Sequence, residues 1–186
     1  MGSNIVRFTG NKVNLCILRE DDDALALYTK WLNDPDINIW IGHNYRIDTL
    51  SCVTQNFRGH KIPFDYLFNI VTVKDDLLIG ICEVKYLPQA RSADLSIYIG
   101  EKGFLSKGYG SESLNLLIKF CFDELNAHRV GLTVLEDNVR AIQCYKKVGF
   151  TFCGTEHDAA FLQGHFTNRL HAEILNPRDS FVQDHE

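Results

Sequence analysis

The chain has 186 residues, of which 45% are hydrophobic, 11% aromatic and 23% charged, with a formal net charge of -5. This composition is that of a globular protein with one core. The 19 Lys and Arg residues against 24 Asp and Glu residues exclude a nucleic-acid coat protein, because phosphate neutralisation needs a basic excess. No apolar run approaches the roughly 20 residues that span a bilayer. We expect a cytoplasmic protein, monomeric or homodimeric, that binds neither nucleic acid nor membrane.

Six cysteines are scattered along the chain without a C-x-x-C pair. Scattered cysteines in apolar surroundings are typical of free thiols in a reducing compartment. Cys153 and His157 have the spacing of two metal ligands, but no second pair completes a tetrahedral zinc site. We therefore expect free thiols and no metal.

Hydrophobic spacing in the first half of the chain predicts a strand, two helices and three strands. The acidic run 20–23 is typical of a helix start. Asp34 ends this helix, because a residue before proline disfavours the helical conformation. The strands are expected at 12–18, 66–73, 77–87 and 92–99, and the helices at 20–33 and 49–57.

The second half predicts a helix, a strand, a helix and two strands. Apolar residues recur at helical spacing from Leu114 to Leu125, over three turns. Residues 130–135 form a strand, and Asn138 caps a helix that Gly149 ends. The last strands cover 151–156 and 165–175, around Gln163-Gly164.

The fold class is therefore α+β (mixed α/β), with a central, mostly antiparallel twisted sheet of about seven strands and about four flanking helices. A single domain covers residues 1–176. The polar C-terminal tail, residues 177–186, is expected to fray.

The segment Leu105–Glu112 contains two glycines, Gly108 and Gly110, just before the predicted helix. Glycines let the backbone approach a ligand, and the free N–H groups of a helix start bind anions. A Walker loop is excluded because Lys107 precedes Gly108, and Ser113 stands where a dinucleotide fingerprint needs glycine. By itself, the loop fits a tight turn equally well.

A second segment, Asn138–Phe150, follows the glycine loop by about 30 residues. With the order of elements, the two segments resemble the Gcn5-related N-acetyltransferase (GNAT) superfamily over nearly the whole chain. The chain is most similar to the branch that acetylates ribosomal-protein N-termini and to its polyamine-acetylating relatives, through residues 18–21, 31–35 and 164–168. Leu105 departs from the superfamily's frequent Arg or Gln, which removes one side-chain contact to phosphate.

The resemblance implies acetyl-CoA as cosubstrate. Its pyrophosphate would bind the N–H groups of 106–111 with charge from Lys107, its pantetheine arm would pair with 97–99, and Asn138 would hydrogen-bond it. The implied binding residues are Ile97, Tyr98, Ile99, Leu105, Ser106, Lys107, Gly108, Tyr109, Gly110, Ser111, Asn138, Ala141, Tyr145 and Lys147.

Tyr145 lies on the apolar face of the predicted helix, which alone is typical of a core residue. Matched to the family pattern, it becomes the general acid, near the thioester sulfur. An amine with a pKa of about 10.4 must lose a proton before attack. Asp94 or Glu83 is a possible base, although each also fits a solvated strand face or an ion pair. Backbone donors near Ile99 would stabilise the oxyanion.

The predicted function is N-acetyl transfer from acetyl-CoA to a primary amine, of a protein N-terminus or a polyamine, by direct attack in a ternary complex. Net acidity favours a cationic acceptor. The acceptor is expected to contact residues 40–58 and the last hairpin, including Phe161 and Phe166. The alternatives are an aminosugar or antibiotic acceptor, and a non-catalytic acyl-CoA-binding sensor or interaction module.

Overall fold

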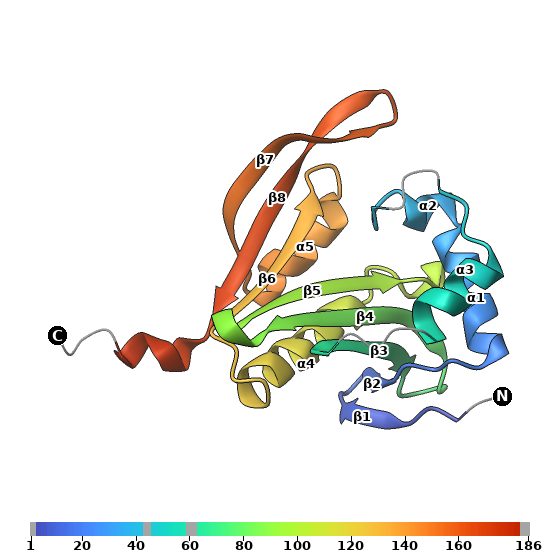
Figure 1. The fold of residues 1–186 in the computed structure, drawn as a ribbon, viewed down its shortest axis with the longest axis horizontal. Coiled ribbons are helices and arrows are strands. Elements are labelled where there is room, and N and C mark those ends of the chain that lie inside the picture. The colour runs from blue at the N-terminus through green and yellow to red at the C-terminus, as the bar shows by residue number, and fades with distance from the viewer. Residues whose placement is uncertain (1–2, 43–45, 59–62, 183–186) are drawn as a thin grey trace.

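The computed structural model describes residues 3–42, 46–58 and 63–182, which contain one eight-stranded sheet of order β1-β2-β3-β4-β5-β6-β8-β7 (Figure 1). The strands are β1 (Val6–Thr9), β2 (Val13–Ile17), β3 (Asp65–Thr72), β4 (Leu78–Leu87), β5 (Ser92–Ile99), β6 (Arg129–Leu135), β7 (Thr151–Leu162) and β8 (His165–Leu175). The helices are α1 (Asp22–Leu32), α2 (Pro35–Asn38), α3 (Leu50–Arg58), α4 (Tyr109–Asp123) and α5 (Val139–Val148).

The α+β class and the predicted order of elements are confirmed, with two additions that bring the described chain to eight strands and five α-helices. The added strand, β1, is short and mostly exposed, so it has no clear apolar alternation. The added helix, α2, has four residues and begins at Pro35, with Asp34 as its cap. The dipeptide Asp34-Pro35, which was expected to end the preceding helix, therefore also starts α2, because proline is favoured at a first helical position.

Two further differences concern the C-terminal part. β7 extends to Leu162, beyond the predicted end at Glu156, so that β7 and β8 form a long hairpin that projects from the sheet (Figure 1). The described part of the tail, expected to fray, instead forms a short 3-10 helix over Pro177–Val182, and 183–186 lie outside the described residues. Asp179 holds it in place by an ion pair with Arg91 (3.0 Å) and a hydrogen bond with the His128 Nδ1 (2.8 Å).

The helices cover both faces of the sheet, and each face has its own apolar cluster. In the larger cluster, Leu114, Leu117 and Cys121 of α4 are fully buried against one face of the strands. In the smaller, Tyr28 and Trp31 of α1 pack with residues of α2, α3 and β4. The described helices include none that is long and apolar enough to cross a membrane.

The sheet divides between β5 and β6. These strands are parallel and pair along the described chain over three residue pairs, from Ser92↔Arg129 to Asp94↔Gly131. Beyond these pairs they diverge, which leaves β1 to β5 in one wing and β6, β8 and β7 in the other (Figure 1). Both α4 and α5 contribute side chains to the larger core, so the wings share one apolar interior.

Replacing Leu117 by Ala tests how far α4 supports this arrangement. Leu117 is fully buried and does not line the cleft described below. We expect Leu117→Ala to lower the free energy of unfolding by about 2–5 kcal/mol, the cost of lost burial plus a cavity. Urea denaturation measures this loss, with the exposed neighbour Asn115→Ala as control. Equal stability of the two variants would contradict the packing.

Candidate functional site

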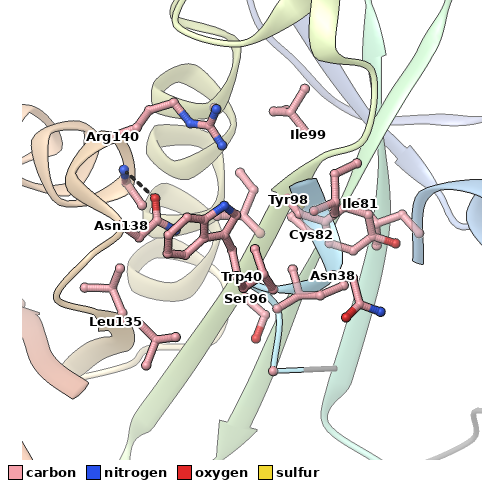
Figure 2. A pocket seen from close by; sticks show the side chains of 18 of the residues that line it. Asn38, Trp40, Ile81, Cys82, Ser96, Tyr98, Ile99, Leu135, Asn138 and Arg140 are labelled. Carbon is pink, nitrogen blue, oxygen red and sulfur yellow. Dashed lines mark hydrogen bonds between the residues drawn. The ribbon is translucent and has the colours of Figure 1, made fainter. Parts of the chain in front are cut away.

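A cleft of about 1870 Å³ opens where β5 and β6 separate. Figure 2 shows Leu135, Asn138 and Arg140 on one side of it and Tyr98 on the other, with Trp40 between them in this view. The walls come mainly from β4, β5, β6 and α5, and further lining residues come from the first turn of α4, from α2 and the segment after it, and from single residues of α1, β3 and β8 and pairs from α3 and β7. The cleft therefore collects residues that are far apart in the sequence.

The edge of β5 that faces β6 offers backbone hydrogen bonds to an extended ligand. Its pairing with β6 ends at Asp94, while its pairing with β4 continues to Ile99. Ser96, Ile97, Tyr98 and Ile99 all line the cleft. An extended ligand can bind such an edge as an added strand.

The loop before α4 forms an anion-binding nest. Ser106 (φ 59°) and Gly108 (φ 88°) adopt left-handed conformations, and Gly108 caps the helix without a side-chain hydrogen bond. Within the described chain, the backbone N–H groups from Ser106 to Ser111 have no protein partner. Consecutive free N–H groups at a helix N-terminus favour a phosphate oxygen or another anion.

Tyr145 lines the cleft from α5 while remaining only 8% exposed. Its ring packs edge-on against Phe150, with the centroids 5.9 Å apart. Burial raises the pKa of Tyr145 to about 12. The hydroxyl is therefore protonated at neutral pH, so Tyr145 can donate a proton to a group in the cleft.

The caps of α5 fix the neighbouring side chains. The predicted caps are confirmed: the Asn138 side chain accepts a hydrogen bond from the Ala141 N–H (3.2 Å), and Gly149 ends the helix at φ 109°. The Asn138 amide N–H₂ is left to serve a ligand. Cys144 also lines the cleft, where its Sγ lies 3.2 Å from the Ser111 Oγ and so links α5 to α4.

The two candidate bases occupy different places. Glu83, on β4, lines the cleft, and its side chain is 19% exposed. Asp94 is not a lining residue; it lies at the junction of the two wings, where it pairs with Arg129 (3.4 Å). Arg129 also binds Glu173 (2.7 Å) and the Ser92 hydroxyl (3.2 Å). The expectation that Asp94 serves as base is therefore not supported by its position, because its carboxylate joins strands.

Most of the other predicted binding residues line the cleft, including Leu105, Ala141 and Lys147. Lys107 does not: its Nζ donates to the Gly103 carbonyl (2.6 Å), away from the expected phosphate site. The ring of Tyr109 packs on Phe104 instead, with the centroids 5.2 Å apart. Both residues contribute their backbone N–H groups to the nest, but not their side chains to the cleft.

The predicted acceptor region is only partly placed in the cleft. Trp40, Arg46 and Phe57 line it, whereas 43–45 lie outside the described residues. Phe161 and Phe166 are 55% and 63% exposed; they pack on each other in the hairpin and do not line the cleft.

Several polar lining residues fall outside the predicted site, namely Asn38, Lys85, Arg140 and Arg169. Arg140 lies in the first turn of the helix capped by Asn138, which is a signal that the sequence contains. Lys85 could have been found as the residue two places after Glu83, on the same face of a predicted strand. The other two depend on tertiary contacts.

The chain was compared with known proteins. A family model described as "Acetyltransferase (GNAT) domain" matches residues 13–151. The probable N-acetyltransferase YjcK of Bacillus subtilis is 30% identical over 62% of this chain and 64% of its own length. The aminoglycoside N(6')-acetyltransferase type 1 of Klebsiella pneumoniae is 24% identical over 82% and 80% of the two chains. YjcK is thus matched over less than two thirds of its length.

Solved structures share the fold. The spermidine N-acetyltransferase of Vibrio cholerae, crystallised with CoA and spermine, superposes with a TM-score of 0.80 at 21% identity, over 89% of this chain and 96% of that chain. An acetyltransferase (GNAT family) from Bacillus anthracis superposes with a TM-score of 0.77 at 14% identity, over 90% and 97%.

Replacing Gly108 by Ala tests the nest with coenzyme A, the ligand implied by the sequence resemblance. A side chain at φ 88° is strained by about 1–2 kcal/mol, so we expect the substitution to tilt the free N–H groups and weaken coenzyme A binding about tenfold. Isothermal titration calorimetry measures the affinity. Gly103→Ala, at an open position without a positive φ, is the control and should leave it unchanged. Equal affinities would contradict the nest.

Proposed function

Because the chain belongs to the GNAT acetyltransferase family, we propose that it transfers the acetyl group of acetyl-CoA to a primary amine by direct attack in a ternary complex. The observation that carries this proposal is that one cleft contains a carboxylate, Glu83, and a protonated phenol, Tyr145. Acetyl transfer needs a base that deprotonates the amine and an acid that protonates the thiolate, and these two groups lie on opposite wings of the sheet.

The residues of the cleft fit acetyl-CoA, which supplies the activated acetyl group. The free N–H groups of 106–111 suit its pyrophosphate, and the unpaired edge of β5 suits its extended pantetheine arm. Arg140 and Lys147 line the cleft from α5 and supply the positive charge that Lys107 does not. Asn138 offers its amide N–H₂ to the same ligand.

Glu83 and Tyr145 divide the proton transfers. Glu83 accepts the proton of the acceptor ammonium, directly or through a water, which makes the amine nucleophilic. Tyr145 donates a proton to the departing thiolate. Cys144 also lines the cleft, yet its contact with Ser111 ties it to the nest. Transfer without an acyl-enzyme therefore fits the arrangement better than transfer through Cys144.

A turnover screen tests the proposal. Purified protein with acetyl-CoA is offered spermidine and an N-terminal peptide, the two acceptors expected from the sequence, together with an aminosugar and an aminoglycoside. We expect thiol release that depends on an amine, and no gain in protein mass with acetyl-CoA alone. A stable mass gain of one acetyl group would contradict direct transfer. Binding of acetyl-CoA without turnover on any amine would favour the sensor.

Single substitutions then separate the roles of three residues. We expect Glu83→Gln to lower kcat about 100-fold, within the usual range for general bases. Tyr145→Phe should lower it about tenfold, because a thiol with a pKa of about 8.5 is already a fair leaving group. Asp94→Asn, the matched carboxylate control, should keep the acid limb of the pH–rate profile, whereas Glu83→Gln removes it.

The pH dependence follows from the raised pKa of Tyr145, about 12. The donor form of the phenol persists below this value, so no alkaline loss of activity arises from Tyr145 between pH 7 and 10. Tyr145→Phe should therefore lower the rate by the same factor across that range. A defect confined to one end of the range would contradict its role as acid.

A further inference from the structure

We propose that the acceptor is a zwitterionic amine, with a carboxylate one carbon away from the amine, as in an α-amino acid. This inference rests on the proposed function and concerns the acceptor end of the same cleft. Its basis is the juxtaposition of Glu83 and Lys85, whose Oε1 and Nζ atoms lie 3.6 Å apart on the cleft surface of β4.

The charges of the cleft differ from those of the whole protein. The chain carries a net charge of -5. Among its described residues, however, the cleft is lined by two acidic side chains, Asp36 and Glu83, and by more numerous basic ones. The segments 43–45 and 59–62, which are not described, contain no Asp or Glu that could add negative charge. The net acidity of the chain therefore does not extend to the described lining of the cleft.

One of the two acids is already neutralised. Asp36 pairs with Lys102 (2.7 Å), which also pairs with Asp34 (2.8 Å). Glu83 has a longer ion pair, 3.6 Å to Lys85, and is the carboxylate that can receive an ammonium group once Lys85 binds another anion. A polyamine presents several cations and needs several carboxylates to replace its hydration, because an unpaired buried charge is costly. The charges thus favour an acceptor with one ammonium.

Lys85 adds the second half of the recognition. Its side chain is 58% exposed and lines the cleft, and its cross-strand partners Asp65 and Asp94 do not line it. Residues two apart on a strand project from the same face. Glu83 and Lys85 therefore form an adjacent negative and positive pair, the charge complement of an ammonium beside a carboxylate. When an acceptor carboxylate binds Lys85, it releases Glu83 to take the proton of the amine.

The neighbouring lining supplies an apolar surface for the acceptor's side chain. Leu67, the cross-strand partner of Glu83, lines the cleft, and so do Trp40 and Phe57. In Figure 2, the indole of Trp40 lies between the two walls of the cleft. An aromatic or aliphatic group on the carbon that bears the amine can pack against this surface.

Matched acceptors test the proposal. Phenylalanine, leucine and lysine are each compared with their amides and with their decarboxylated amines, phenethylamine, isoamylamine and cadaverine, and spermidine serves as the polyamine. Thiol release gives kcat/KM, and mass spectrometry identifies the acetylated product. We expect at least one acid to exceed its amide and its amine about tenfold or more, the usual effect of a charge-assisted hydrogen bond.

Substitution of Lys85 separates recognition from structure. We expect Lys85→Gln to lower the ratio of kcat/KM for the acid to kcat/KM for its amide about tenfold, which removes the preference for the acid. Lys74→Gln, in the exposed turn between β3 and β4, is the control and should keep the preference. Equal losses on all acceptors would overturn the proposal, because Lys85 would then act on Glu83 alone.

The outcomes distinguish this inference from the proposed function. If amides, amines or spermidine are acetylated at least as fast as every acid, the proposal of a zwitterionic acceptor is overturned. The proposed acetylation of amines then stands. Transfer to none of these acceptors by protein that binds coenzyme A in calorimetry would overturn both. A preference for an acid that Lys85→Gln abolishes would establish the recognition.

Discussion

The early end of pairing between β5 and β6 is the constraint on which the site depends. Three residue pairs join the strands. At this junction Arg129 lies so close to Gly131 that a Cβ there would be 2.6 Å from its guanidinium. Its contacts with Glu173 and Ser92 tie β6 to β8 and β5. Past the junction, β5 has backbone groups that a protein must satisfy with water or ligand. The cleft thus follows from strand divergence.

The two wings bring different chemistry to this opening. The α4 side offers backbone N–H groups, held by left-handed Ser106 and Gly108. The α5 side offers Tyr145, whose protonated state follows from its burial between core and cleft. Glu83, on β4, faces these groups from the other wing. The cleft between the wings is thus lined by both a phenol and a carboxylate.

Local sequence signals predicted the helices α4 and α5, because apolar spacing and capping residues depend only on neighbouring residues in the chain. The apolar period around Leu114 marked α4, and the side chain of Asn138 and the left-handed Gly149 marked the ends of α5. The choice between Glu83 and Asp94 could not be made in this way. Both lie on one face of adjacent strands, and what separates them is Arg129, a residue of β6 that the fold brings to Asp94. Such a contact has no local signal.

The two ends of the cleft differ in what they are made of, backbone groups at one end and side chains at the other. Backbone N–H groups and a strand edge depend on few side chains, and the fold that positions them is shared by chains of 14–21% identity. The acceptor end is lined by side chains of β4 and of the segment after α2. The pair formed by Glu83 and Lys85 therefore carries information about the acceptor that the fold does not.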